Sequence, residues 1–137
     1  MKKEEENEKG FTLLELIVVI IIIGVLASLG LPQFFKTVEK GRTAEGTSLL
    51  SVMRSAQLRY YAEKASFTTT PANLDVDYTT PKYFTITLQA PAYAEGNVIV
   101  TATRNATQRP TGFSQVLTVT VGGTIACSGG GCSSLGY

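Results

Sequence analysis

The fold of this chain is decided by the stretch Gly10-Phe11-Thr12-Leu13-Leu14-Glu15 and by the run from Leu16 to Phe35 that follows it. The run holds 20 residues without a charge, and a helix of that length spans about 30 Å, the thickness of a bilayer's hydrocarbon core. Its apolar side chains lie on every face of such a helix, unlike the one-sided pattern of a core helix. The sequence therefore predicts a membrane-spanning helix over residues 11–35.

Glu15 places a carboxylate just before this run, on the helix that must enter lipid. A charge in a membrane helix is costly unless it is paired, so such a residue is a functional candidate by default. Cleavage of the chain after Gly10 would leave Phe11 as a new N-terminus, with its ammonium one helical turn from Glu15. The stretch therefore predicts a processing site next to a carboxylate that needs a cationic partner.

Residues 9–16, Lys-Gly-Phe-Thr-Leu-Leu-Glu-Leu, resemble the leader junction of type IV pilins and of the pseudopilins of type II secretion. In that family a membrane peptidase cuts after the glycine and methylates the new amine of the phenylalanine. The resemblance therefore implies cleavage between Gly10 and Phe11, N-methylation of Phe11, and a leader peptide over residues 1–10. It also implies that Glu15 pairs with the terminal amine of a neighbouring subunit during filament assembly.

The same resemblance, which covers roughly residues 9–45, assigns a role to two residues inside the span. Pro32 cannot donate a hydrogen bond to the carbonyl of Ser28, so it predicts a kink. Pilins often have a glycine and a proline at such positions, and their helix is thought to loosen between them in the filament. Gly24 and Pro32 are therefore expected weak points of the helix.

The charges around the span leave two points open. The leader carries three Lys and four Glu, while Lys36, Lys40 and Arg42 follow the span, so the positive-inside rule favours the opposite orientation. The cleavage motif overrules this in our interpretation. An uncleaved signal anchor is the alternative for the first residues, because an ordinary signal peptide has a shorter apolar region.

Helical character continues beyond the apolar run, to about Ala65. Glu39 with Arg42, and Arg59 with Glu63, are spaced for pairing on one face of a helix. An apolar stripe for one side of a soluble helix recurs at helical spacing over Leu49, Met53, Ala56 and Tyr60. We therefore expect one long helix over residues 11–65, whose second half supports a globular head over residues 66–137.

The head has the pattern of a small sheet. Residues 66–82 form a loop by composition, with prolines that discourage helix. β-branched and aromatic residues then alternate with Thr, as in a sheet with one buried face, over residues 83–88, 98–103, 116–121 and 124–127. The predicted fold class is α+β, with the long N-terminal helix packed against three or four antiparallel strands.

Two cysteines, Cys127 and Cys132, lie near the end of the chain. Two cysteines without a histidine cannot complete a closed structural zinc site. An exported head, as the resemblance implies, lies in oxidising surroundings, which favours a disulfide between them. We expect the bridge to close a C-terminal loop in the head.

Composition argues against catalysis and nucleic-acid binding. The chain has no His, and its net charge of +1 gives no electrostatic footprint for a nucleic acid. Asp75 and Asp77, with Glu95, lack the dense run of oxygen ligands that a calcium loop needs. We therefore expect no catalytic, cofactor or metal residues, and no enzyme.

The resemblance implies a structural function. The expected protein is a prepilin that lies in the inner membrane as a single-pass protein and then joins an extracellular or periplasmic filament. Its expected partners are identical or related pilin subunits, the prepilin peptidase, an inner-membrane assembly platform and, before assembly, membrane lipid. One alternative is a pseudopilin of a type II secretion system. Another is a membrane-anchored periplasmic or surface binding module that uses the helix only as a tether.

Overall fold

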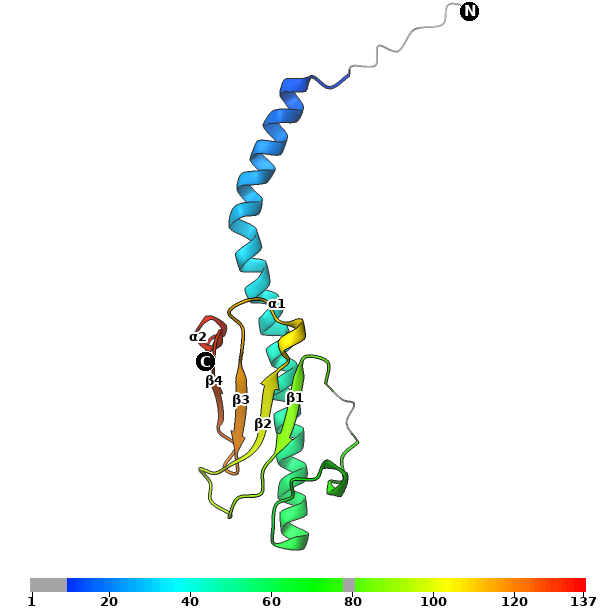
Figure 1. Cartoon of the computed structure of the whole chain (residues 1–137), viewed down its shortest axis with the longest axis vertical. Helices are drawn as coiled ribbons and strands as arrows, with labels where there is room; N and C mark the ends of the chain where they lie inside the picture. The colour runs from blue at the N-terminus through cyan, green and yellow to red at the C-terminus, as the bar shows by residue number, and fades with distance from the viewer. Residues whose placement is uncertain (1–9, 78–80) are drawn as a thin grey trace, which may run out of the picture. The chain divides into compact units, whose positions relative to one another are not determined.

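The computed structural model describes residues 10–77 and 81–137 (Figure 1). The chain divides between Phe34 and Phe35 into two compact units, which are described in turn. One helix, α1 (Leu13–Lys64), supplies the body of the first unit and one layer of the second. Nine of the ten predicted leader residues lie outside the described residues.

The first unit is the apolar part of α1 with the three residues before it. The helix begins at Leu13, two residues after the predicted start, and it passes through Gly24 and Pro32 without a break. Every side chain from Phe11 to Phe34 is exposed. Among the described residues, α1 is the one helix long and apolar enough to cross a membrane by length and composition, with a mean hydropathy of 2.8 over 18 residues.

The second unit packs the rest of α1 against a four-stranded antiparallel sheet (Figure 1). The strand order β1-β2-β3-β4 follows the chain, so the sheet is a meander. This confirms the α+β class and the upper strand number predicted. The strands, within two residues of the predicted bounds, are β1 (Phe84–Leu88), β2 (Val98–Arg104), β3 (Val116–Thr120) and β4 (Ile125–Ser128).

The core lies between one face of α1 and the inner face of the sheet. Leu50 and Met53 of the helix, with Phe84, Ile99 and Leu117 of the strands, are almost completely buried. The predicted apolar stripe was right for Met53 and Ala56, which are buried, but wrong for Leu49. Leu50 and not Leu49 is buried, because the buried face follows the helical spacing of Glu39, Thr43, Gly46, Leu50 and Met53.

Gly46 sets how closely the helix approaches the sheet. A Cβ atom at this position would lie 2.9 Å from Cδ1 of Leu117 and 3.1 Å from the ring of Phe84. Real Cβ atoms do not tolerate a contact of 2.9 Å, so any side chain here would push the two layers apart. The absence of a side chain at Gly46 therefore fixes the spacing of this part of the core.

Polar side chains of α1 hold the loops at the other end of the second unit. Gln57 is fully buried and bonds both backbone groups of Thr68, donating to its carbonyl and accepting from its amide. Arg54 donates from Nε and Nη2 to the carbonyl of Val121, just before the β3–β4 turn. The predicted loop after the helix contains one short 3₁₀ turn, Pro71–Asn73, and its residues 78–80 lie outside the described residues.

The C-terminal segment forms a closed loop. Cys127 of β4 and Cys132 are joined by a disulfide, which confirms the predicted bridge, and α2 (Cys132–Leu135) follows. The intervening glycines lie against the chain before β3. Ser114 and Gly130 exchange hydrogen bonds of 2.9 and 3.0 Å, and a Cβ at Gly130 would lie 2.6 Å from the carbonyl oxygen of Gly112.

Candidate functional site

Glu15 and Thr12 form a capping box at the start of α1. Because the helix begins at Leu13, Thr12 is the N-cap residue and Glu15 is the third helical residue. The amide of Glu15 donates to Oγ1 of Thr12 at 3.2 Å, and the amide and hydroxyl of Thr12 donate to Oε2 of Glu15 at 3.4 Å each. This reciprocal pattern satisfies backbone donors that the first turn of a helix leaves unpaired.

Sequence reasoning missed this role of Thr12, although a Thr followed three residues later by Glu is the signal for a capping box. The carboxylate of Glu15 is therefore hydrogen-bonded in the uncut chain, and it also lies favourably at the positive end of the helix dipole. Both donors are neutral, and contacts of 3.4 Å are at the long limit for hydrogen bonds. A cationic donor would bind the same carboxylate more strongly.

The predicted cleavage site lies just outside the helix. Gly10 and Phe11 have no regular secondary structure, and the side chain of Phe11 is 81% exposed. Apart from Gly10 and its chain neighbours, no heavy atom of the described residues lies within 4 Å of the position that a Cβ of Gly10 would take. A protease that binds an extended backbone therefore has access to the bond between Gly10 and Phe11.

Glu15 lies beside apolar surface and not in a polar pocket. A surface hollow of about 240 Å³ is lined by Phe11, Glu15, Leu16 and Val19. All the large apolar residues of this part of the helix are exposed. The structure does not bring Gly24 or Pro32 to this site, because both lie further along the same exposed helix.

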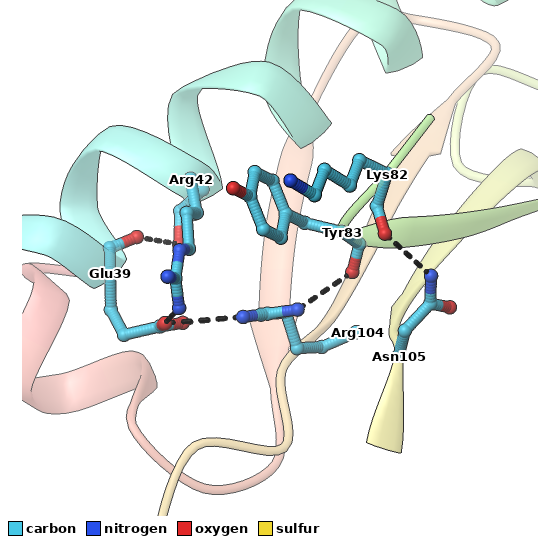
Figure 2. Close-up of polar contacts among 7 residues, drawn as sticks. Glu39, Arg42, Lys82, Tyr83, Arg104 and Asn105 are labelled. Carbon is cyan, nitrogen blue, oxygen red and sulfur yellow. Dashed lines mark hydrogen bonds and ion pairs between the residues drawn. The ribbon is translucent and has the colours of Figure 1, made fainter. Parts of the chain in front are cut away.

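The second unit contains a buried charge cluster, which sequence reasoning found only in part (Figure 2). The carboxylate of Glu39 accepts from Nη1 of Arg42 at 2.6 Å, as helical spacing predicted, and from Nε and Nη2 of Arg104 at 3.1 Å each. Arg104 also donates to the carbonyl of Tyr83 at 3.0 Å. Glu39 and Arg104 are 65 residues apart in the chain, so no local spacing could have paired them.

The ring of Tyr83 lies next to three cations. The guanidinium carbons of Arg42 and Arg104 lie 4.7 and 5.2 Å from its centroid, and Nζ of Lys82 lies at 5.5 Å. Such contacts stabilise a cation against an aromatic face. The side chains of Glu39, Arg42 and Arg104 together hold one negative and two positive charges, so this cluster is positive.

Arg59 pairs with Asp75 and not, as helical spacing predicted, with Glu63. Its Nε and Nη2 donate to the Asp75 carboxylate at 2.7 to 3.1 Å. The hydrogen bond from Arg59, with its charge, holds the pKa of the Asp75 carboxyl below its ordinary value. In the described part of the chain no three potential metal ligands come together. The carboxylate of Asp75 is already bonded to the guanidinium of Arg59.

The match to a family model lies in the N-terminal part of the chain. Residues 7–31 match the family model described as the prokaryotic N-terminal methylation motif. The chain is 36% identical over 58 residues to the type IV major pilin protein PilA of Myxococcus xanthus, which is 42% of this chain and 26% of the relative. It is 37% identical over 70 residues to the type II secretion system core protein G of Escherichia coli, which is 51% of this chain and 48% of the relative.

A third relative is the type IV major pilin protein PilE1 of Neisseria gonorrhoeae, with 39% identity over 54 residues, 39% of this chain and 33% of the relative. The matches thus span between a quarter and a half of the length of these three curated relatives. No solved structure gives a significant match. Pilins and core protein G are comparably distant, and the shared family is one of structural, non-enzymatic proteins. The chain carries the N-terminal methylation motif and has a long helix whose second half packs against an antiparallel sheet, and in its sequence it is similar to type IV pilins and type II secretion pseudopilins.

Proposed function

We propose that this chain is a precursor cut between Gly10 and Phe11, N-methylated at Phe11, and assembled through its apolar helix into a type IV pilus or related filament. The observation that supports this most directly is the position of Glu15. Its carboxylate sits in the first turn of α1, whose apolar part is exposed, beside an accessible non-helical junction. A subunit that packs on this helix would bury the carboxylate, so the partner must bring a positive charge.

Cleavage creates that charge. In the precursor the nitrogen of Phe11 is an amide, whereas a new terminal amine has a reference pKa of about 7.7–8.0 and is charged at neutral pH. Glu15 would then exchange its two long contacts with Thr12 for an ionic hydrogen bond to the amine of a neighbouring subunit. Assembly would be favoured only after processing, because the precursor offers no amine at this position.

The expected course is insertion in the inner membrane as a single-pass protein, processing by the prepilin peptidase, and transfer through an inner-membrane assembly platform into an extracellular or periplasmic filament. The apolar helix supports the membrane step by its length and composition. Identical or related pilin subunits are the partners in the filament.

A pseudopilin of a type II secretion system is the second candidate, favoured by the similarity to core protein G. Two observations favour the pilus. The C-terminal loop is closed by a disulfide. Asp75, the first carboxylate of the candidate calcium loop, is bonded to Arg59 instead. In a tethered binding module the helix would not pack against other subunits, so the carboxylate of Glu15 would cap the helix but would have no cationic partner.

The variant Glu15→Gln tests the assembly step. A glutamine also serves in a capping box, so this change removes the charge of Glu15 while preserving its contacts with Thr12. We expect normal insertion and cleavage, but a sharp loss of filament relative to the membrane pool of cleaved protein. Glu63→Gln is the matched control, because Glu63 is exposed near the far end of the same helix. Normal filament yield from Glu15→Gln would refute the proposed role.

Processing is tested separately by intact-mass spectrometry of protein from the native host. We expect a chain that begins at Phe11 and carries one additional methyl group. A bulky residue in place of Gly10 should leave the precursor uncut in the membrane. A mature species that retains residues 1–10 would contradict the proposed function.

A further inference from the structure

The second unit carries its positive charge at one end. The exposed side chains Lys36 and Lys40 lie on the first turns of this unit's helix. Lys82, also exposed, stacks on the same Tyr83 ring as Arg42. The loop between β2 and β3, which carries the exposed Arg109, lies at this end too (Figure 1). We call these side chains the basic collar: Lys36, Lys40, Arg42, Lys82 and Arg109.

Few carboxylates neutralise the basic collar. Glu39 is shared between Arg42 and the buried Arg104. Glu45 is half-buried, with one carboxylate oxygen enclosed and without a hydrogen-bond partner. Among the charged side chains that the structure describes, six cations therefore face two carboxylates at this end of the unit, where Tyr137 also lies beside Lys40. This imbalance leaves the exposed lysines available to an external anion.

The other end of the second unit is close to neutral. Arg59 and Asp75 neutralise each other there. Arg54 is bonded to Val121 at the β3–β4 turn, next to the loop that carries Glu95. Glu63 and Lys64, at the end of α1, also cancel in charge. This end of a second copy of the chain therefore offers little negative charge to bind the basic collar.

The position of the basic collar along the chain indicates that lipid headgroups are the anions nearest to it. Lys36 follows the last residue of the uncharged run directly, and Arg42 lies only six residues further along the helix. At 1.5 Å per residue the helical cations are spread over about 9 Å, close to one Debye length at physiological salt. A helix whose apolar run fills the hydrocarbon core would therefore hold these cations at the level of the lipid phosphates.

The orientation of the protein makes these cations unexpected. Under the proposed function they lie on the non-cytoplasmic side, where the positive-inside rule disfavours Lys and Arg. Anionic headgroups in the leaflet on that side would offset this disadvantage. Near an anionic membrane surface each basic residue contributes about 1 kcal/mol, or about fivefold in the binding equilibrium.

We propose that the basic collar binds the phosphates of anionic glycerophospholipids and thereby holds the second unit against the membrane surface until the subunit is extracted. The proposal rests on the proposed membrane orientation. It adds a lipid-binding surface in the head that retains the unassembled subunit at the membrane.

A fluorescent reporter on the full chain tests this proposal in nanodiscs. The chain has no Trp, so the variant Ala44→Trp gives a single fluorescence signal. Ala44 is exposed on α1, at the same end of the unit as the basic collar. The discs contain phosphatidylcholine with or without phosphatidylglycerol, and a trace of lipid with a nitroxide on its headgroup as quencher. We expect stronger quenching with phosphatidylglycerol, and loss of the difference at high salt.

Charge variants identify the surface. Lys40→Gln should weaken the phosphatidylglycerol-dependent state about fivefold, and Lys36→Gln/Lys40→Gln/Lys82→Gln should abolish it. Lys64→Gln is the matched control, because it removes one exposed Lys from the other end of the unit. Quenching that does not depend on phosphatidylglycerol, or an equal loss in the control, would overturn the proposal.

A second reporter separates this inference from the proposed function. Leu26→Trp places the single Trp within the apolar run and reports insertion by a blue-shifted emission. If the Leu26→Trp chain inserts normally but the quenching of Ala44→Trp does not depend on phosphatidylglycerol, the lipid proposal is overturned and the proposed function is not. If the collar variants lowered filament yield without any dependence on phosphatidylglycerol, the collar would be a contact between subunits instead.

Discussion

Arg104, at the end of β2, donates two hydrogen bonds of 3.1 Å to the carboxylate of Glu39 in α1, and both side chains are almost completely enclosed. Figure 2 shows the Glu39 carboxylate between Arg42 and Arg104. A fork of two parallel bonds fixes direction as well as distance. This contact therefore fixes the register of the sheet on the helix at the end of the unit opposite to Gln57.

Loss of one partner should destabilise the second unit strongly. Glu39→Met leaves the buried guanidinium of Arg104 without its carboxylate, which typically costs about 3–5 kcal/mol. The double variant Glu39→Met/Arg104→Met should be less destabilised than Glu39→Met alone, because it leaves no buried charge and Arg42 can turn to solvent. Denaturant unfolding of the full chain in detergent, followed by tyrosine fluorescence, measures the free energies. If the loss of unfolding free energy in the double variant equalled the sum of the losses in Glu39→Met and Arg104→Met, the two side chains would not be energetically coupled.

The Arg59–Asp75 pair should give a small stability contribution that depends on pH. The folded state lowers the pKa of Asp75, so the contribution is present above the unfolded-state pKa of about 3.9 and is lost as the pH falls through the folded-state value. Both side chains are exposed, which keeps the contribution small. Asp75→Asn should therefore lower Tm slightly at pH 7 and not at all near pH 2. Asp77→Asn, a nearby exposed carboxylate, is the control, and an equal effect at both pH values would argue against the pair.

Removal of the disulfide should have a local and modest effect. The bridge joins residues five apart, and the chain-entropy model gives such a small ring about 2 kcal/mol. Cys127→Ser/Cys132→Ser should loosen α2 and the glycine contacts with Ser114 while the core of Leu50, Met53 and Leu117 persists. Hydrogen exchange of the parent and the variant would show this as faster exchange confined to the C-terminal segment. Faster exchange throughout the strands would mean that the bridge supports the whole sheet.

The weak segment of α1 remains a prediction for the filament. In this structure the helix runs through Gly24 and Pro32 without interruption. The weakness is nevertheless present in the sequence, because Pro32 has no amide hydrogen for Ser28 and Gly costs about 1 kcal/mol in a helix relative to Ala. We expect the amides between them to exchange faster in filaments than in the membrane-embedded subunit. The double change Gly24→Leu/Pro32→Leu should impair assembly more than insertion, and unchanged exchange and filament yield would exclude a functional weak segment.

Features that depend on neighbours along the chain could be predicted from the sequence alone. The apolar helix follows from 20 uncharged residues, the strands from alternation of β-branched and polar residues, and the Glu39–Arg42 pair from helical spacing. The Thr12–Glu15 capping box, which sequence reasoning missed, could also have been predicted, because its two residues are only three positions apart. Local geometry decides all of these, so no knowledge of the packed structure is needed.

Which residues meet across the core depends on how the helix and the sheet pack. Helical spacing alone places Lys36 and Arg42 within reach of the Glu39 carboxylate, whereas only the packing of β2 on α1 brings Arg104 to it. In the same way, the loop after the helix folds back so that Arg59 meets Asp75 and not Glu63. The buried face passes through Leu50 and not Leu49, because the absence of a side chain at Gly46 sets where the sheet approaches the helix. Contacts between residues distant in sequence depend on the relative position of whole elements, which no local pattern encodes.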